Sequence, residues 1–163
     1  MIICIDVGNT RTKVAVYENS TLQQLIITNN EKLIKNISKQ IQGIENCVDI
    51  ILSSVGNLSV ETIDKLKTLG NLIIVNHETH VPFKNLYSTP TTLGIDRIVL
   101  AAGATLKYPN QNRLVIDAGT CITYDYVNSS NQYHGGAISP GIGLRYKSLN
   151  DYTANLPLEK ISE

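Results

Sequence analysis

The sequence has 163 residues, which is enough for one ordinary domain or two small ones. Hydrophobic residues make up 42% of it and charged residues 17%, a globular composition that excludes disordered and collagen-like chains. Fourteen basic side chains balance fourteen acidic ones, so there is no net positive charge to hold nucleic acid or an anionic membrane nonspecifically.

The predicted strands begin at the N-terminus. Met1–Ile5 is a continuous apolar run, typical of a strand that is buried on both faces. The turn-forming residues Gly8–Arg11 follow, and Thr12–Tyr17 and Leu22–Ile27 then resume the strand pattern. The short connection between the first two strands predicts a β-hairpin rather than a crossover.

Helices then alternate with strands. Apolar residues at helical spacing predict a helix over Leu33–Ile41 and a shorter one over Val60–Leu66. The apolar run Val48–Leu52 predicts a buried strand between the two helices, and Leu72–Val75 predicts a further strand after the second one. This alternation indicates an α/β fold with a largely parallel core.

The next segment reads as a loop, a helix and a linker. Asn76–Thr92 carries two prolines and few apolar residues, which predicts a long surface loop of the kind that often holds function. One apolar face predicts a helix from Ile95 to Leu106. Tyr108–Asn112 is the best linker candidate. Farther on, four glycines at positions 135, 136, 141 and 143 predict a tight connection around Pro140.

An internal repeat follows the linker. Leu114–Thr120 echoes Ile3–Thr10: each is an apolar strand that ends in Asp, Gly and Thr. Both are followed by a second strand, Thr12–Tyr17 in the first copy and Cys121–Val127 in the second. The coincidence of these residue types at the end of both strands indicates a duplication.

The two copies predict a phosphate-binding cleft. Asp6 and Asp117 each end a buried strand, where a carboxylate is costly unless a cation or hydrogen bonds meet it. Turn amides, a Thr hydroxyl and Lys13 would offer donors and positive charge to a polyphosphate, and a carboxylate would suit its Mg²⁺. The alternative is that each segment is simply a favourable turn sequence.

Asp96 is the candidate for chemistry. It falls in the first turn of the predicted helix, next to Arg97. The helix dipole favours an ionised carboxylate there, so a purely structural role is a strong alternative. The functional interpretation is that Asp96 accepts a proton from a substrate hydroxyl while Arg97 binds a polar or anionic group.

Cysteine usage bears on location. Cys4, Cys47 and Cys121 lie far apart without CxxC spacing, which favours a reducing compartment over a disulfide framework or structural zinc. No apolar run approaches a membrane span, and Asp6 comes too early for a signal peptide. We expect a cytoplasmic protein with neither a membrane nor a nucleic acid as partner.

The ordered motifs of the chain resemble those of type III pantothenate kinases. They are DVGNTRTK at 6–13, NLYSTP at 85–90, LGIDR at 93–97, DAGT at 117–120, HGGAISPGIG at 134–143 and TANLP at 153–157. The resemblance covers essentially the whole chain. It implies the acetate and sugar kinase, Hsp70 and actin superfamily, an α/β fold of duplicated ribonuclease H-like (actin-like ATPase) domains with mixed sheets flanked by helices. Residues 1–110 would form the first domain and 111–163 the start of a second, which looks incomplete.

The resemblance also implies an activity, the ATP-dependent phosphorylation of pantothenate to 4'-phosphopantothenate that opens coenzyme A biosynthesis. It implies ATP binding by Asp6, Val7, Gly8, Asn9, Thr10, Arg11, Thr12, Lys13 and Thr120. It implies pantothenate binding by Tyr87, Gly94, Ile95, Asp96 and Arg97, with Asp96 as the catalytic proton acceptor. It assigns Mg²⁺ to Asp6, a monovalent cation (K⁺ or NH₄⁺) to Asp117, and a homodimer to the protein.

Two alternatives stay open. The first is another kinase of the same superfamily with a sugar or carboxylate substrate, which the LGIDR motif and Tyr87 disfavour. The second is a non-catalytic, nucleotide-sensing accessory protein on the same fold, a role that would not need Asp96.

Overall fold

A computed structural model describes residues 1–44, 47–56 and 58–159. The chain forms two compact units. The first unit comprises Met1–His80 and Gly94–Val99, and the second comprises Val81–Leu93 and Leu100–Glu163. These two units are defined by contacts between residues, whereas the domains predicted at 1–110 and 111–163 rest on the sequence repeat. The predicted domains therefore stay a prediction. The last four residues of the second predicted domain lie outside the described residues.

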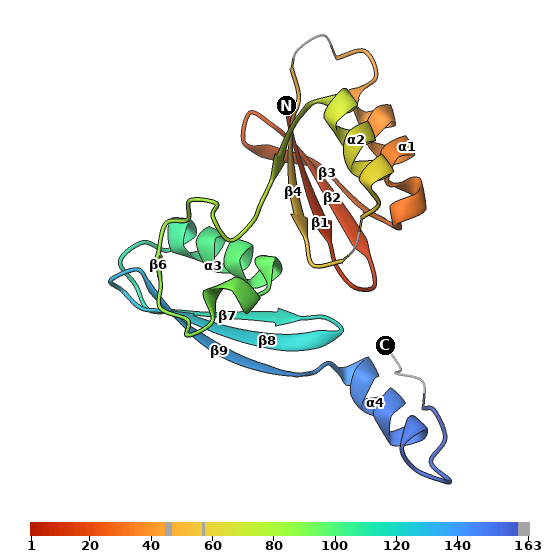
Figure 1. Cartoon of the computed structure of the whole chain (residues 1–163), viewed down its shortest axis with the longest axis vertical. Helices are drawn as coiled ribbons and strands as arrows, with labels where there is room; N and C mark the ends of the chain where they lie inside the picture. The colour runs from red at the N-terminus through yellow and green to blue at the C-terminus, as the bar shows by residue number, and fades with distance from the viewer. Residues whose placement is uncertain (45–46, 57, 160–163) are drawn as a thin grey trace. The chain divides into compact units, whose positions relative to one another are not determined.

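The first unit contains a mixed five-stranded sheet in the order β3-β2-β1-β4-β5 (Figure 1). The first three strands form an antiparallel meander, and β4 and β5 run parallel to β1. The predicted hairpin is therefore present. The largely parallel core that the sequence predicted is found only in the part formed by β1, β4 and β5, and the sheet as a whole is mixed. The strands are β1 (Ile2–Val7), β2 (Thr12–Glu18), β3 (Thr21–Thr28), β4 (Asp49–Ser54) and β5 (Asn71–Ile74).

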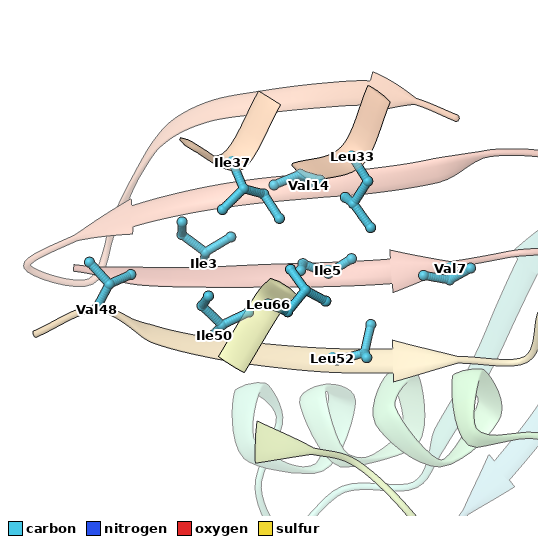
Figure 2. Packing of buried hydrophobic residues seen from close by; sticks show 10 residues of the cluster. All are labelled: Ile3, Ile5, Val7, Val14, Leu33, Ile37, Val48, Ile50, Leu52 and Leu66. Atoms are coloured by element: carbon cyan, nitrogen blue, oxygen red, sulfur yellow. The ribbon is translucent and has the colours of Figure 1, made fainter. Parts of the chain in front are cut away.

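Two helices, α1 (Asn30–Ile41) and α2 (Val60–Leu69), cover one face of this sheet. Figure 2 shows Leu33 and Ile37 of α1 and Leu66 of α2 pointing toward the side chains of the strands. Full burial of such side chains stabilises the fold by roughly 1.5–3 kcal/mol each. The core of the first unit consists of Ile3, Ile5, Val7, Val14, Leu33, Ile37, Val48, Ile50, Leu52 and Leu66.

Side chains at the sheet and at the helix starts fix where α1 and α2 begin. The Asn29 side chain accepts a hydrogen bond from the Lys32 amide, and Ser59 caps α2 in the same way. Such caps are worth about 1 kcal/mol each. In addition, the hydroxyl of Thr12 donates to Asn30 Oδ1 at 2.7 Å, which fastens the first residue of α1 to β2.

The second unit contains a four-stranded sheet in the order β6-β9-β8-β7. Its last three strands form an antiparallel meander, and the short β6 runs parallel to β9. Helix α4 (Ile142–Asp151) follows β9 directly. The strands are β6 (Lys84–Asn85), β7 (Arg113–Ala118), β8 (Cys121–Val127) and β9 (Gln132–Pro140).

One continuous helix, α3 (Ile95–Lys107), has its first residues grouped with the first unit and the rest with the second. In the second unit, Ala101 and Thr105 are buried, and Arg113 of β7 donates to the Thr105 carbonyl at 3.4 Å. A 3₁₀ turn, Pro90–Thr92, precedes α3. Within the described part of the chain, none of the helices is long and apolar enough to cross a membrane.

The predicted fold class is confirmed. The protein is α/β, with two mixed sheets flanked by helices, and the duplication inferred from the sequence appears as a repeated order of elements. A β-hairpin, a third antiparallel strand and a helix occur as β1-β2-β3-α1 and again as β7-β8-β9-α4. This is the duplicated ribonuclease H-like arrangement expected from the resemblance.

Two local predictions were wrong in part. The tight connection predicted over 135–143 is limited to Gly141, because 132–140 form the strand β9 and α4 begins at Ile142. Its glycines reflect close packing: a Cβ on Gly136 would lie 1.6 Å from the carbonyl oxygen of Tyr124 on the neighbouring strand. The predicted surface loop 76–92 also contains β6 and the 3₁₀ turn, and it buries Phe83.

Candidate active site

The first hairpin turns sharply between β1 and β2. Asp6 and Lys13 face each other across the ladder as register partners. The Gly8 amide donates to the Arg11 carbonyl at 3.1 Å and closes the turn, and the amide of Val55 donates to the Val7 carbonyl at 3.1 Å from the loop after β4. The turn is thus closed by its own backbone hydrogen bond, and the end of β1 that leads into it is held by the loop after β4.

Exposure divides the residues of this hairpin into two groups. Asn9, Thr10, Arg11 and Lys13 are exposed, and Asp6 and Gly8 are half-buried. The side chains of Val7 and Thr12 are buried in the sheet, so either residue could meet a ligand only through its backbone. Among the described residues, no group of three or more His, Cys, Asp or Glu is placed to hold a metal ion by itself. A cation at Asp6 would therefore need oxygens from a ligand or water.

The second hairpin repeats this construction between β7 and β8. Asp117 is half-buried and faces Thr123 across the ladder. The Gly119 amide donates to the Cys121 carbonyl at 2.9 Å, and the Gly141 amide donates to the Thr120 carbonyl at 2.9 Å. A Cβ on Gly141 would lie 2.2 Å from the Gly119 carbonyl oxygen, so only glycine permits the start of α4 to pack this closely on the turn.

The predicted catalytic carboxylate lies at the start of α3. Asp96 is half-buried in the first turn, and its Oδ1 accepts a hydrogen bond from the Arg97 amide at 2.9 Å. A Cβ on Gly94 would come within 2.4 Å of the same oxygen, so the glycine leaves room for the carboxylate. Arg97 and Ile95 are buried. The arrangement orients a carboxylate whose charge the helix dipole favours.

Tyr87, the other predicted substrate contact, is half-buried just after β6. Its amide donates to Asn85 Oδ1 at 2.9 Å. Its ring lies next to Gly135 on β9 and forms a tilted pair with the ring of Tyr133, 6.4 Å between centroids. Tyr133 donates its hydroxyl to Asp125, and both are buried.

The structure groups the predicted site residues by unit. Asp6–Lys13 and Gly94–Arg97 belong to the first unit, and Tyr87, Asp117 and Thr120 belong to the second. That the two acidic hairpins face each other stays a prediction. Sequence reasoning missed Asp125 and Tyr133; the signal that could have found Asp125 is its place in the alternation Thr123, Asp125, Val127, which is the buried side of β8.

Comparison with known proteins gives consistent matches. A sequence profile of the type III pantothenate kinase family matches residues 2–163. A type III pantothenate kinase from Flavobacterium johnsoniae is 50% identical over 158 residues, which cover 97% of this chain and 65% of the relative. One from Flavobacterium psychrophilum is 44% identical over 167 residues, which cover 100% of this chain and 68% of the relative. The chain thus spans about two thirds of the length of these curated relatives.

Among solved structures, a Campylobacter jejuni protein assigned to the Baf family of transcriptional activators matches with a TM-score of 0.53. The match covers 92% of this chain and 59% of that protein at 24% sequence identity. At this level of identity the likeness concerns the fold alone.

Proposed function

We propose a function from one premise: this chain belongs to the type III pantothenate kinase family. We infer that the protein transfers a phosphoryl group from ATP to pantothenate, giving 4'-phosphopantothenate in the first step of coenzyme A biosynthesis. The family match over residues 2–163 carries this proposal. The geometry of the hairpins and of the start of α3 supports it, because each motif provides groups of the chemistry that phosphoryl transfer needs.

The first hairpin would bind the phosphates of ATP. Exposed Asn9, Thr10 and Arg11 present turn amides and side-chain donors, and Lys13 adds a mobile positive charge. Gly8, Val7 and Thr12 would contribute through the backbone, since the latter two side chains are buried. Thr120 on the second hairpin is exposed and would add a hydroxyl donor.

The two hairpin carboxylates fit cations. Asp6 is half-buried beside the turn that would hold phosphates, which suits Mg²⁺, a hard cation that usually takes one or two carboxylates plus phosphate oxygens and water. Mg²⁺ would neutralise charge that develops on the transferred group. Asp117, also half-buried, would hold the monovalent cation (K⁺ or NH₄⁺).

Asp96 would act as the proton acceptor. Its Oδ1 is oriented by the Arg97 amide, so Oδ2 would take the proton from the primary alcohol of pantothenate as the oxygen attacks the γ-phosphorus. Gly94, Ile95 and Arg97 would shape the pocket around that alcohol, and Tyr87 would contact the rest of the substrate. A homodimer, as the family resemblance implies, and a cytoplasmic location, as expected from the cysteine usage, complete the proposal.

A coupled assay of ATP consumption, with and without pantothenate and K⁺, tests the proposal. It is run on the chain and on a chimera in which the chain replaces the matching part of the Flavobacterium johnsoniae relative. We expect pantothenate-dependent turnover that Asp96→Asn lowers by roughly 10²–10⁴-fold, without a change in the unfolding midpoint. Phosphorylation of a sugar but not of pantothenate would reject the assignment. ATP binding without turnover in the chimera would favour the nucleotide-sensing alternative.

A further inference from the structure

The ring of Tyr87 occupies the space that a side chain on Gly135 would need. A Cβ built on Gly135 would lie 2.6 Å from Cδ2 and 2.9 Å from Cε2 of Tyr87. Gly135 also has φ of +85°, a conformation that L-residues with a side chain rarely adopt. The strand β9 therefore carries at this point a residue that lets an aromatic ring lie directly on its backbone.

A second aromatic residue lies two positions earlier on the same strand. Tyr133 is fully buried, and its ring is stacked on Phe83 at 5.3 Å and tilted against Tyr87 at 6.4 Å, measured between centroids. Both distances fall in the range where aromatic pairs attract each other beyond simple burial. The ring of Tyr87 thus has Tyr133 beside it and Gly135 beneath it.

Tyr133 is itself anchored by a buried acid. Its hydroxyl donates to Asp125 Oδ1 at 2.5 Å, and the two residues are 0% and 1% exposed. A buried carboxylate is costly unless it is hydrogen-bonded, so this contact fixes both partners. Asp125 stands on β8, whose ladder with β9 places it opposite Gly136.

The backbone of the 84–87 segment is tied to the same strand. The Lys84 amide donates to the Asn131 carbonyl at 2.8 Å, and the Leu86 amide donates to the Tyr133 carbonyl at 2.9 Å. The Tyr87 amide donates to Asn85 Oδ1. The chain on which Tyr87 stands is therefore registered against the residues that its ring contacts.

We propose that Gly135 and Tyr133, anchored by Asp125, are positioning residues that hold the Tyr87 ring in one orientation for pantothenate. The proposal rests on the proposed function, because it takes Tyr87 as a substrate contact. Gly135 and Tyr133 act through Tyr87 and not on the substrate. Their loss should therefore weaken pantothenate binding more than it slows phosphoryl transfer.

A double-mutant cycle tests the contact without any activity measurement. We compare the loss of denaturation midpoint caused by Gly135→Ala in the wild-type background and in the Tyr87→Ala background. The loss should shrink by roughly half or more in the second background, because the ring is gone and only the strain at positive φ remains. Gly103→Ala, the same substitution on α3 where a Cβ meets nothing within 4 Å, should behave alike in both backgrounds. An equal loss for Gly135→Ala in the two backgrounds would overturn the proposal.

Steady-state kinetics in the chimera test the consequence for substrate. Tyr133→Leu and Gly135→Ala should each raise the KM for pantothenate about tenfold while kcat changes less than about threefold. Tyr133→Phe keeps the ring but removes the hydroxyl that donates to Asp125, so it should raise the KM for pantothenate, but by less than Tyr133→Leu does. If Tyr87→Ala raises this KM and neither positioning variant does, the positioning role is wrong. If Tyr87→Ala leaves the KM unchanged, the substrate role assumed under the proposed function fails instead, and the cycle still decides the contact.

Discussion

The two β-β-β-α segments share an order of elements but differ in what their strands bury. On β1, Ile3 and Ile5 are 0% and 2% exposed beneath the helices of the first unit. At the matching places of the repeat on β7, Leu114 and Ile116 are 63% and 56% exposed. The same apolar pattern is thus buried in β1 and exposed in β7.

The helices account for this difference. α1 buries Leu33 and Ile37 against its sheet, whereas α4 has no buried residue. α1 is also fastened to β2 through Thr12, while the equivalent position on β8 is Ile122, which has no hydroxyl to offer α4. An apolar strand pattern therefore defines only which face of a strand can be buried. That face contributes to stability when a helix or another element is packed and held on it.

The largest expected effect is on stability, from matched truncations in the two strands. Ile5→Ala should lower the free energy of unfolding of the first unit by about 2–5 kcal/mol, because it opens a cavity in a fully packed core. Ile116→Ala removes an exposed side chain and should change stability by no more than about 0.5 kcal/mol. Urea denaturation followed by circular dichroism measures both. Equal losses would mean that the two faces are buried alike in solution.

The next effect concerns the carboxylates that end the two strands. On the proposed function, Asp6→Asn should raise the Mg²⁺ concentration needed for half-maximal rate, and Asp117→Asn should raise the K⁺ concentration needed. Each variant should lower kcat/KM about tenfold or more, since a charged partner is lost. Titrations of each cation at saturating levels of the other separate the two roles. If both variants altered the response to the same cation, the assignment of Mg²⁺ to Asp6 and of K⁺ to Asp117 would be wrong.

A smaller effect should follow from the link between sheet and helix. Thr12→Val keeps the shape of the buried side chain but removes the hydroxyl that donates to Asn30, so we expect a loss of about 1 kcal/mol. Hydrogen exchange should show faster opening of the first turn of α1. Ile122→Val at the equivalent place is the control and should leave exchange in α4 unchanged.

The smallest effects concern one exposed ion pair in each unit, and they have opposite dependence on pH. A hydrogen bond from Lys65 lowers the pKa of Glu61 on α2. The contribution of this ion pair to stability is therefore present above the ordinary pKa of a glutamate and is lost as pH falls through the lowered pKa. A hydrogen bond to Asp151 raises the pKa of Lys147 on α4, so that contribution is present below the ordinary pKa and is lost as pH rises through the raised value.

Glu61→Gln and Lys147→Met test these signs. The difference in helix hydrogen exchange between wild type and Glu61→Gln should vanish in acid, and the difference for Lys147→Met should vanish in strong alkali. Both effects should be slight and should weaken further with added salt, because the pairs are solvent-exposed. A reversed pH order would contradict the assignment.

Local patterns predicted the first unit well. The apolar run at Met1–Ile5 and the helical spacing over Leu33–Ile41 correspond to β1 and α1, because each element buries a regular face in a complete core. The duplicated Asp-Gly-Thr motif predicted both hairpins for a similar reason, since turn chemistry is encoded within a few residues.

The rest depended on contacts that no short window contains. The strand β9 was missed because its glycines resemble a turn. In the structure, the backbone of Tyr124 leaves no room for a side chain at Gly136, and a ring from a distant segment leaves none at Gly135. Helix α4 was missed because its start, Gly141, offers no side-chain cap. At the candidate site, Asp96 was placed by its motif, whereas the partnership of Tyr133 with Asp125 requires the pairing of β8 with β9.

The unequal surroundings of the thiols have a practical consequence for labelling. Cys4 is half-buried on β1, and burial raises the pKa of its thiol, whereas Cys47 is exposed. Maleimides react with the thiolate, so at neutral pH a fluorophore should attach to Cys47 well before Cys4. Because the chain has no tryptophan, such a dye on the first unit would supply the fluorescence signal for nucleotide addition that tryptophan supplies in other proteins.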